Sequence, residues 1–571
     1  MRYETAVAHC RSRLMAGSVV FLFAFGVIGV KLVETGLLRP EKPVASASAD
    51  TKAAAGVLPV RADIVDRNGE VLATDLSTAS LYVKPKEIRD QREDAANLAR
   101  VLPGLGVKEL TKKLSEKRGF VWIKRNLTPK EQYEVNALGI PGLYFQVEQR
   151  RVYPYKELFS HVVGYVGVDN KGLSGAEKSL EPMLEKQASP LALSLDMRVQ
   201  HVLRDEISRA MKEFNAIGGS GLVMDATNGE IVGMVSLPDF DPHFPTADAK
   251  TRFNRNSLGV YEMGSTFKAF TTAMALDSGK ANIFSGYDAT RPLEYANFKI
   301  HDSHPENRWL TVAEIFKHSS NIGTARMALQ QGTEKQKEFL RKLGLMEPVD
   351  IELPEKASPL YPAEWKELST ITISFGHGMS VSPLHVVRGV SAMVNGGVLL
   401  PLTLVKGANG EVGKGDRVIS EKTSDMMRRL FRLVVEDGTG SKAKAVGYVV
   451  GGKTGTAEKV GAGGYNRKAL MSSFVCAFPM HAPRYVMLVM LDEPKGNAST
   501  YGYATGGWTA APTASRVIGR IAPMLGVKPV DENDPQLTKL LELPASQAVP
   551  SEKVAAKTDR PMQRGIKLVS Y

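Results

Sequence analysis

The sequence predicts an α/β domain over residues 193–530, with an antiparallel sheet and a helical subdomain. Two apolar segments, 220–225 and 230–236, flank the turn residues Ala226-Thr227-Asn228-Gly229 and predict a hairpin. A largely helical stretch follows, and strand-like segments return at 446–457, 470–478 and 484–492. Strands at both ends with helices between them indicate that the first and last segments share one sheet.

The amino-acid pattern before residue 193 and after residue 530 differs from that of this domain. Asp196 predicts the N-cap of a helix whose apolar residues recur at helical spacing. Residues 58–192 mix short strands, helices and loops, and predict a separate α+β pedestal or dimerisation-type module. Within it, Asn68-Gly69 predicts a tight turn, and Thr128 to Glu131 forms a capping box. Residues 531–571 are polar and basic and predict a disordered tail.

The first 57 residues predict a membrane anchor and a linker. Residues 1–13 carry three arginines and predict a cytoplasmic segment, and residues 14–38 are long and apolar enough to predict one transmembrane helix. Residues 39–57 are rich in Pro, Ala and Ser and predict a linker. The alternative is a cleaved signal peptide, but Ala45-Ser46-Ala47 lies far beyond the apolar core. We expect the rest of the chain to lie outside the cytoplasmic membrane.

Charge and cysteine content narrow the function classes. The net charge of +12 fits contact with an anionic surface such as a membrane, whereas the chain shows no nucleic-acid-binding motif, so we expect no nucleic-acid partner. Cys10 and Cys476 would lie on opposite sides of the membrane and could not pair. No ligand pattern indicates a metal or an organic cofactor, and we predict none.

Ser265 and Lys268 form the pattern that predicts chemistry. They occur at the start of an apolar helix that ends near Gly279, so the amine and the hydroxyl are expected to lie on one face, near free backbone N–H groups. A hydroxyl with a base in reach predicts an activated nucleophile. The second Ser-x-x-Lys, Ser441 to Lys444, lacks a buried helix and is expected to be a solvated loop.

Two further motifs follow in order. Ser319-Ser320-Asn321 and Lys453-Thr454-Gly455-Thr456 come after Ser265, and each alone is common in proteins. Ser-x-x-Lys, Ser-x-Asn and Lys-Thr-Gly in this order are typical of penicillin-binding proteins and class A β-lactamases. From about residue 60 to 530 the chain resembles class B penicillin-binding proteins, most closely the division-specific peptidoglycan transpeptidases. Segments at 61–69, 150–154, 172–177 and 437–440 also resemble that family.

The resemblance implies a serine β-lactamase-like transpeptidase domain and a role for each motif. Ser265 would attack the penultimate D-Ala carbonyl of a stem ending D-Ala-D-Ala, and an amine of a neighbouring stem would then take the acyl group. Lys268 would be the base, which requires its pKa to fall from near 10.4 to near 7 through burial and the nearby Lys453. Ser319 would pass a proton to the leaving amine, and Asn321 would hold a substrate amide.

The Lys-Thr-Gly strand would bind the other end of the substrate. By resemblance, Thr454 and Thr456 with Lys453 would hold the terminal carboxylate, and the strand including Gly455 would accept the peptide edge-on. Backbone N–H groups of Ser265 and Thr456 would form the oxyanion hole. β-Lactams would acylate Ser265, and the partners would be a membrane glycosyltransferase and other proteins of the division septum.

Three positions depart from the family pattern. Met263 stands where Pro often precedes the glycine, His377 stands where Tyr is common, and Ser320 replaces the Asp of class A β-lactamases. Three alternatives stay open: an elongation-specific class B transpeptidase, a membrane-bound β-lactamase, and a non-catalytic scaffold or sensor. Asn321 and Thr454 favour the division type over the elongation type, and no second carboxylate base indicates a β-lactamase.

Overall fold

A computed structural model describes residues 61–544 except 188, 247, 411–412 and 462–463, together with residues 15, 22, 25 and 26. The predicted cytoplasmic segment, transmembrane helix and linker therefore lie outside the described residues apart from those four, as does the tail from 545 onward. Within the described part of the chain, no helix combines the length and the apolar character needed to cross a bilayer.

The chain forms two compact units, residues 77–150 and residues 61–76 with 151–544. Residues 77–150 contain helices and strands around one small apolar core, which includes Leu81, Leu98, Leu110 and Ile123. Asp90 and Thr128 cap two of the helices, the second through the predicted capping box. The mixed α+β character predicted for this region is confirmed. The elements are α3 (Gln91–Val101), α4 (Val107–Leu114), β3 (Val121–Leu127), α5 (Pro129–Ala137) and parts of β2 (Val71–Val83) and β4 (Leu143–Val152).

The larger unit is organised around a five-stranded antiparallel sheet, with strand order β14-β15-β16-β6-β7. The predicted hairpin is β6 with β7, and β16 pairs with β6, so the first and last segments do share one sheet. Every residue of β6, β7 and β16 is buried, which explains their continuous apolar runs. The strands are β6 (Gly218–Asp225), β7 (Ile231–Leu237), β14 (Gly451–Gly461), β15 (Gly464–Phe478) and β16 (Tyr485–Asp492).

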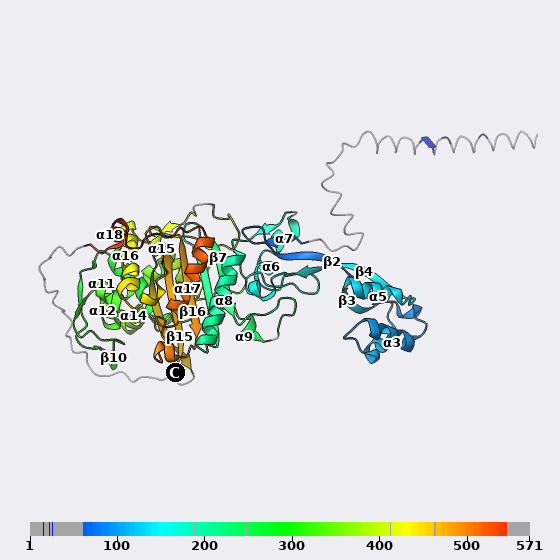
Figure 1. Ribbon diagram of the computed structural model, residues 1–571, viewed down its shortest axis with the longest axis horizontal. Helices are drawn as coiled ribbons and strands as arrows, with labels where there is room; N and C mark the ends of the chain where they lie inside the picture. The colour runs from blue at the N-terminus through cyan, green and yellow to red at the C-terminus, as the bar shows by residue number, and fades with distance from the viewer. Residues whose placement is uncertain are drawn as a thin grey trace, which may run out of the picture. The chain divides into compact units, whose positions relative to one another are not determined.

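Helices cover both faces of this sheet. On one face, α8 (Met197–Glu213) and α17 (Ala510–Met524) lie side by side, and Asp196 caps α8 as predicted (Figure 1). The other face packs against α10 (Lys268–Asp277), α15 (Pro383–Val394) and α16 (Glu421–Asp437). The first turn of α10 therefore lies between the sheet and the helical subdomain, and it is preceded by the 3₁₀ turn η4 (Gly264–Phe267).

The predicted helical subdomain is also present. Its core is formed by side chains such as Leu310, Ile315, Ile322 and Ile371. Its elements are α11 (Val312–His318), α12 (Asn321–Gln331), α13 (Thr333–Lys342), α14 (Glu367–Ser374), and the paired short strands β8 (Gly286–Asp288) with β11 (Trp309–Thr311) and β9 (Leu293–Tyr295) with β10 (Phe298–Ile300).

A buried ion-pair network joins residues 61–76 to residues 151–192 within the larger unit. Arg61 and Arg151 both contact Glu177, at 2.9 and 2.7 Å, and all three side chains are nearly inaccessible to solvent. Asp75 and Glu181 complete the network. Residues 61–192 are thus divided between the two compact units. The elements here are β1 (Ile64–Val65), α6 (Gly175–Ser179), α7 (Glu181–Lys186) and β5 (Leu191–Ala192).

Folded chain continues beyond residue 530. Helix α18 (Pro535–Leu541) falls within the segment predicted to be disordered, and Leu541 is buried against the main core. The sequence signal for this helix is weak because the helix is short and its flanks are polar. The remaining short elements are η2 (Pro85–Glu87), η3 (Lys156–Phe159), α9 (Ala249–Arg252), β12 (Val398–Leu399), β13 (Asp416–Arg417), η5 (Ser441–Ala443) and η6 (Ala498–Thr500).

Candidate active site

Ser265 lies on the tight turn η4, pressed against the edge strand of the sheet. Gly264 has φ +52°, and a Cβ there would lie 2.3 Å from the Thr456 carbonyl oxygen, so only glycine allows this approach. The Ser265 side chain is half-buried, and no hydrogen bond joins its hydroxyl to another described residue. The Lys268 amine makes no hydrogen bond to the Ser265 hydroxyl and donates to Ser319 instead.

Two buried lysines share the hydroxyl of Ser319. Lys268 Nζ donates to Ser319 Oγ at 3.1 Å and also to the Ser319 carbonyl oxygen. Lys453 Nζ donates to the same Oγ at 2.9 Å. Lys268 and Lys453 are 1% and 0% exposed, which is exceptional for lysine. Each of the three sequence motifs therefore contributes one residue to a single cluster.

Burial lowers the pKa of both amines. The pKa of Lys268 falls to about 7, chiefly through burial, and the charge of Asp302 opposes the fall. The pKa of Lys453 falls well below its usual value, through burial and repulsion from Lys268. Because the two amines meet at one hydroxyl, they do not both hold a proton easily. A neutral Lys268 is the state that can accept a proton from a serine hydroxyl.

The backbone of the Ser319 segment is strained, and the carboxylate of Asp302 holds the segment in place. Ser319 itself has φ +60°, a left-handed conformation that is uncommon for a residue with a side chain. Asp302 accepts hydrogen bonds from the Ser320 hydroxyl and from the backbone N–H groups of Asn321 and Ile322, at the start of α12. A carboxylate there also interacts favourably with the helix dipole.

Asn321 lies two residues after Ser319 in the chain, but its side chain makes no hydrogen bond to Lys268, Ser319 or Lys453. Its amide Nδ2 donates to the His301 carbonyl oxygen at 2.8 Å, which fixes the orientation of the amide group. The amide oxygen has no protein partner among the described residues.

Replacing Asp302 by asparagine tests how this cap acts on Lys268. The change removes the charge that raises the pKa of Lys268, so we expect the pH midpoint of Ser265 acylation to move below about 7. Asparagine still caps a helix, so unfolding should become easier by less than about 1 kcal/mol. The pH profile of penicillin acylation measures the first effect and thermal denaturation the second. An upward or absent shift contradicts the assignment, and Asp416→Asn, on an exposed strand, is the control.

Strand β14 places the Lys-Thr-Gly residues along an edge of the sheet. Among the strands that the structure describes, its one neighbour is β15, with Lys453 opposite Val475 and Thr456 opposite Ser472. The Thr454 hydroxyl lies 2.8 Å from the Thr439 hydroxyl, and the Thr456 hydroxyl accepts from the Gly506 N–H at 3.1 Å. An unpaired strand edge can take up an extended peptide.

Gly455 allows the nucleophile turn to pack against this strand. A Cβ at Gly455 would lie 2.3 Å from both Ser473 Oγ and Thr266 Oγ1, and 2.8 Å from the Met263 carbonyl oxygen. Glycine is therefore required at this position by the close packing of the nucleophile turn against β14. This packing alone explains why Gly455 belongs to the site, and no substrate contact is needed to explain it.

Gly455→Ala is accordingly expected to push the nucleophile turn away from β14. Overpacking of this kind costs about 1–3 kcal/mol, and the displacement should lower the acylation rate at least tenfold. Denaturant unfolding and the rate of penicillin acylation measure the two effects. Gly519→Ala in α17 is the matched control, since its Cβ meets no atom within 4 Å and alanine favours helix. Unchanged acylation in Gly455→Ala would show that the packing does not position Ser265.

Sequence reasoning missed residues that carry no motif. Asp302 lies in a loop between two short strands, and Gly506 contacts the site from a loop distant in the chain. Only their spatial positions reveal their roles. Thr439 lies in segment 437–440, which resembles the family, but its contact with Thr454 was not predicted. The second Ser-x-x-Lys was interpreted correctly as exposed, with a short 3₁₀ turn at its start and Lys442 over the Trp508 ring.

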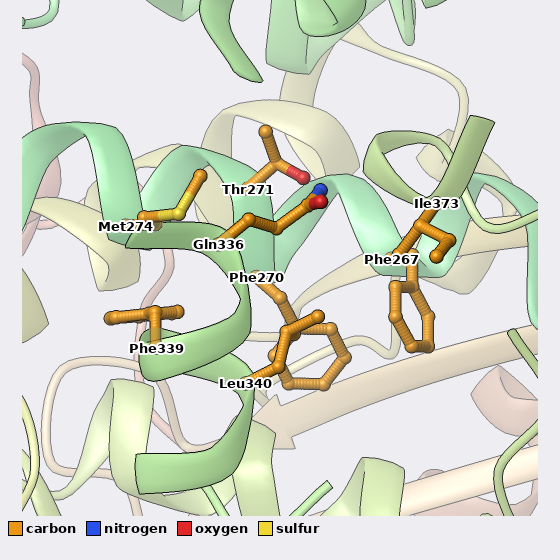
Figure 2. Close-up of a pocket in the computed structure, with 8 residues that line it drawn as sticks. All are labelled: Phe267, Phe270, Thr271, Met274, Gln336, Phe339, Leu340 and Ile373. Atoms are coloured by element: carbon orange, nitrogen blue, oxygen red, sulfur yellow. The ribbon is translucent and has the colours of Figure 1, made fainter. Parts of the chain in front are cut away.

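A small cavity behind the nucleophile turn is part of the hydrophobic core. Figure 2 shows its lining from η4, α10, α13 and α14, with the Phe267 and Phe270 rings packed edge-on at 5.1 Å between centroids. The two polar groups in it, Thr271 and Gln336, are hydrogen-bonded to protein atoms. This cavity therefore supports the position of η4 and offers no free polar group for a substrate.

The chain matches two families. The penicillin-binding protein transpeptidase domain matches residues 219–519, and the penicillin-binding protein dimerisation domain matches residues 57–191. The chain therefore belongs to the penicillin-binding protein transpeptidase family.

Relatives narrow this class to one activity. The probable peptidoglycan D,D-transpeptidase FtsI of Caulobacter vibrioides is 45% identical over 83% of each chain. The probable peptidoglycan D,D-transpeptidase PenA of Neisseria gonorrhoeae is 34% identical over 82% of this chain and 85% of its own. Penicillin-binding protein 3 of Mycobacterium, solved with aztreonam, has a TM-score of 0.65 at 23% identity, over 83% of this chain and 98% of its own, and supports the fold. The protein is a peptidoglycan D,D-transpeptidase of the FtsI type.

Proposed function

We propose that Ser265 is the acyl-accepting nucleophile and that the Lys268–Ser319–Lys453 cluster moves its proton. Lys268, with a pKa of about 7, is available as a neutral base at neutral pH. The Ser265 hydroxyl attacks the penultimate D-Ala carbonyl, its proton passes to Lys268, and the leaving D-Ala amine receives a proton through Ser319. Ser319 is suited to this relay because its hydroxyl contacts both amines.

Lys453 recognises the terminal carboxylate of the donor stem together with Thr454 and Thr456. A bound carboxylate favours the charged form of Lys453, and repulsion then favours the neutral form of Lys268. Substrate binding in this way prepares the base for the reaction. Asn321 holds a substrate amide with its free amide oxygen, and β14 pairs with the stem backbone.

The oxyanion hole consists of the backbone N–H groups of Ser265 and Thr456. The close approach of Gly264 to the Thr456 carbonyl supports this assignment, because it brings the two backbones together. Losing one donor of such a pair typically costs about 3 kcal/mol of transition-state stabilisation. The same arrangement would accept a β-lactam as a substrate analogue that leaves a stable acyl-enzyme on Ser265.

We propose the biological setting from the sequence and the relatives. Residues 14–38 anchor the protein in the bacterial inner membrane, with residues 1–13 in the cytoplasm and the catalytic domain outside. The relatives named FtsI, together with Asn321 and Thr454, favour cross-linking at the division septum. The partners are then a membrane glycosyltransferase and other division proteins, contacted through the anchor or residues 58–192.

One observation carries the catalytic proposal: two lysines from distant motifs are buried at the same hydroxyl. The full-length protein in detergent should release D-Ala from a peptide ending D-Ala-D-Ala and join the remaining acyl group to an added amine. Release without detectable transfer at any amine concentration would indicate a hydrolase. Depletion in cells separates the two settings, since filaments indicate division and rounded cells indicate elongation.

A further inference from the structure

The loop from Phe375 to Gly378 lies directly against the nucleophile turn. Gly264 N–H donates to the Gly376 carbonyl oxygen at 3.2 Å, and a Cβ on Gly376 would lie 2.0 Å from the Gly264 carbonyl oxygen. The residues that follow these two glycines are His377 and Ser265. Close backbone packing therefore holds His377, which stands where Tyr is common in the family, beside the reaction centre.

Glu262 ties this loop to strand β15. Its Oε1 accepts from the Gly378 N–H at 2.7 Å and from the Tyr465 hydroxyl at 3.0 Å. Tyr465 lies edge-on to the His377 ring, with centroids 5.5 Å apart, and Phe375 contacts the same ring at 5.6 Å. Glu262 thus fixes the two segments between which the imidazole is held.

The His377 imidazole is suited to accept a proton. Burial and the charge of Lys268 lower its pKa, so the ring is neutral at pH 7 and one nitrogen carries a free lone pair. Its Nδ1 is buried without a partner among the described residues. The titratable groups described around it are Lys268, Glu262 and Tyr465. Burial raises the pKa of the Tyr465 hydroxyl, which keeps that group neutral.

The acylation step leaves His377 unused, whereas the second step requires another base. An acceptor amine is mostly protonated at pH 7, because alkyl ammonium groups such as lysine titrate near 10.4. After acylation the Ser265 proton has left with D-Ala, so Lys268 is neutral and can carry only the one proton that passes from the amine to Ser265 Oγ. The incoming ammonium brings one more proton than that. A second neutral base near Ser265 separates these two proton transfers.

We propose that His377 takes a proton from the acceptor amine when the acyl group is transferred, and that Glu262 and Tyr465 are positioning residues for His377. The proposal rests on the proposed function of Ser265. The incoming ammonium loses one proton to His377, and its nitrogen bonds to the acyl carbon. The bond from that carbon to Ser265 Oγ then breaks, and the second proton of the amine passes through Ser319 to Oγ. His377 releases its proton to solvent, so the net products are an amide, the free serine and one proton.

The test compares acyl transfer to an amine with acylation, using His377→Gln in the full-length protein. Glycylglycine serves as the amine probe, with a D-Ala-D-Ala peptide as donor. At pH 7 we expect the ratio of amine product to hydrolysis product to fall at least tenfold, with penicillin acylation of Ser265 within twofold of wild type. At pH 9, where more of the probe is already neutral, the ratio should recover towards wild type.

Two further variants separate positioning from folding. Tyr465→Phe removes the hydroxyl that contacts Glu262 but keeps the ring, so it should lower the ratio in the same direction and by less. His481→Ala is the matched control: this histidine also has an unpartnered Nδ1, but it lies in the turn after β15, far along the strand from Ser473. An unchanged ratio in His377→Gln, or a parallel loss of acylation, would overturn the proposal. Failure of the wild-type protein to be acylated would instead refute the function on which it rests.

Discussion

Replacing Lys268 by methionine is expected to end acylation of Ser265 while making the protein more stable. Methionine matches the length of the buried side chain and needs no hydrogen bonds at a position where the lysine is only 1% exposed. Removing a buried ionisable group in this way can stabilise a protein by about 1–4 kcal/mol. Loss of the base should lower the acylation rate by about 10⁴-fold or more. Stopped-flow acylation with a reporter β-lactam and thermal denaturation measure the two quantities.

The pH dependence of the wild-type protein follows from the same pKa. Neutral Lys268 is the active form, so the acylation rate should rise with pH through about 7. Stability should also rise with pH between about 7 and 10.5: there the unfolded chain binds a proton on this lysine and the folded chain does not. The slope of the stability curve over this range should decrease in Lys268→Met.

Lys268→Arg provides the control for charge. Arginine stays protonated throughout this range, so the variant should be inactive and also less stable, since a buried guanidinium lacks a partner. If Lys268→Met were acylated at more than one hundredth of the wild-type rate, another group would have to be the base.

Ser265→Ala is expected to abolish both acylation and peptide cross-linking while leaving the fold intact. Loss of a serine nucleophile typically lowers turnover by about 10⁶-fold. The Ser265 hydroxyl has no hydrogen bond to another described residue, so the free energy of unfolding should change by less than about 1 kcal/mol. Complementation of a depleted strain measures the biological effect.

This variant also decides between catalysis and scaffolding. If Ser265→Ala restored normal division, the chemistry would be dispensable and the scaffold interpretation would hold. Ser441→Ala, in the exposed second Ser-x-x-Lys, is the matched control and should complement fully.

Regular patterns made much of the fold predictable. The apolar runs of β6 and β7 and the cap at Asp196 depend on local sequence, and local sequence was sufficient to place them. The tail was predicted less well. Helix α18 is stabilised by contacts such as that of Leu541 with the main core, which no local pattern records.

The sequence was sufficient to predict which motif residues lie together in the site, but it was not sufficient to predict which of them contact one another. Spacing on a helix suggested that Lys268 reaches Ser265, but the tight turn η4 and the left-handed Ser319 direct the amine to Ser319. Burial lowers the pKa of Lys268 as expected, but the expected contribution of Lys453 is not present, and the nearby charge that acts on Lys268 is that of Asp302, which opposes the fall. The repulsion between the two lysines lowers the pKa of Lys453 instead. The acidic cap at Asp302 could not be predicted, because its effect depends on a loop folding over the start of α12.

Mass spectrometry of the penicillin-treated protein is the most direct test of the account. After proteolysis, one acyl adduct should be found on the peptide that contains Ser265, and it should be missing in Ser265→Ala. An adduct on another residue, or none in a protein shown to be folded, would contradict the placement of the nucleophile.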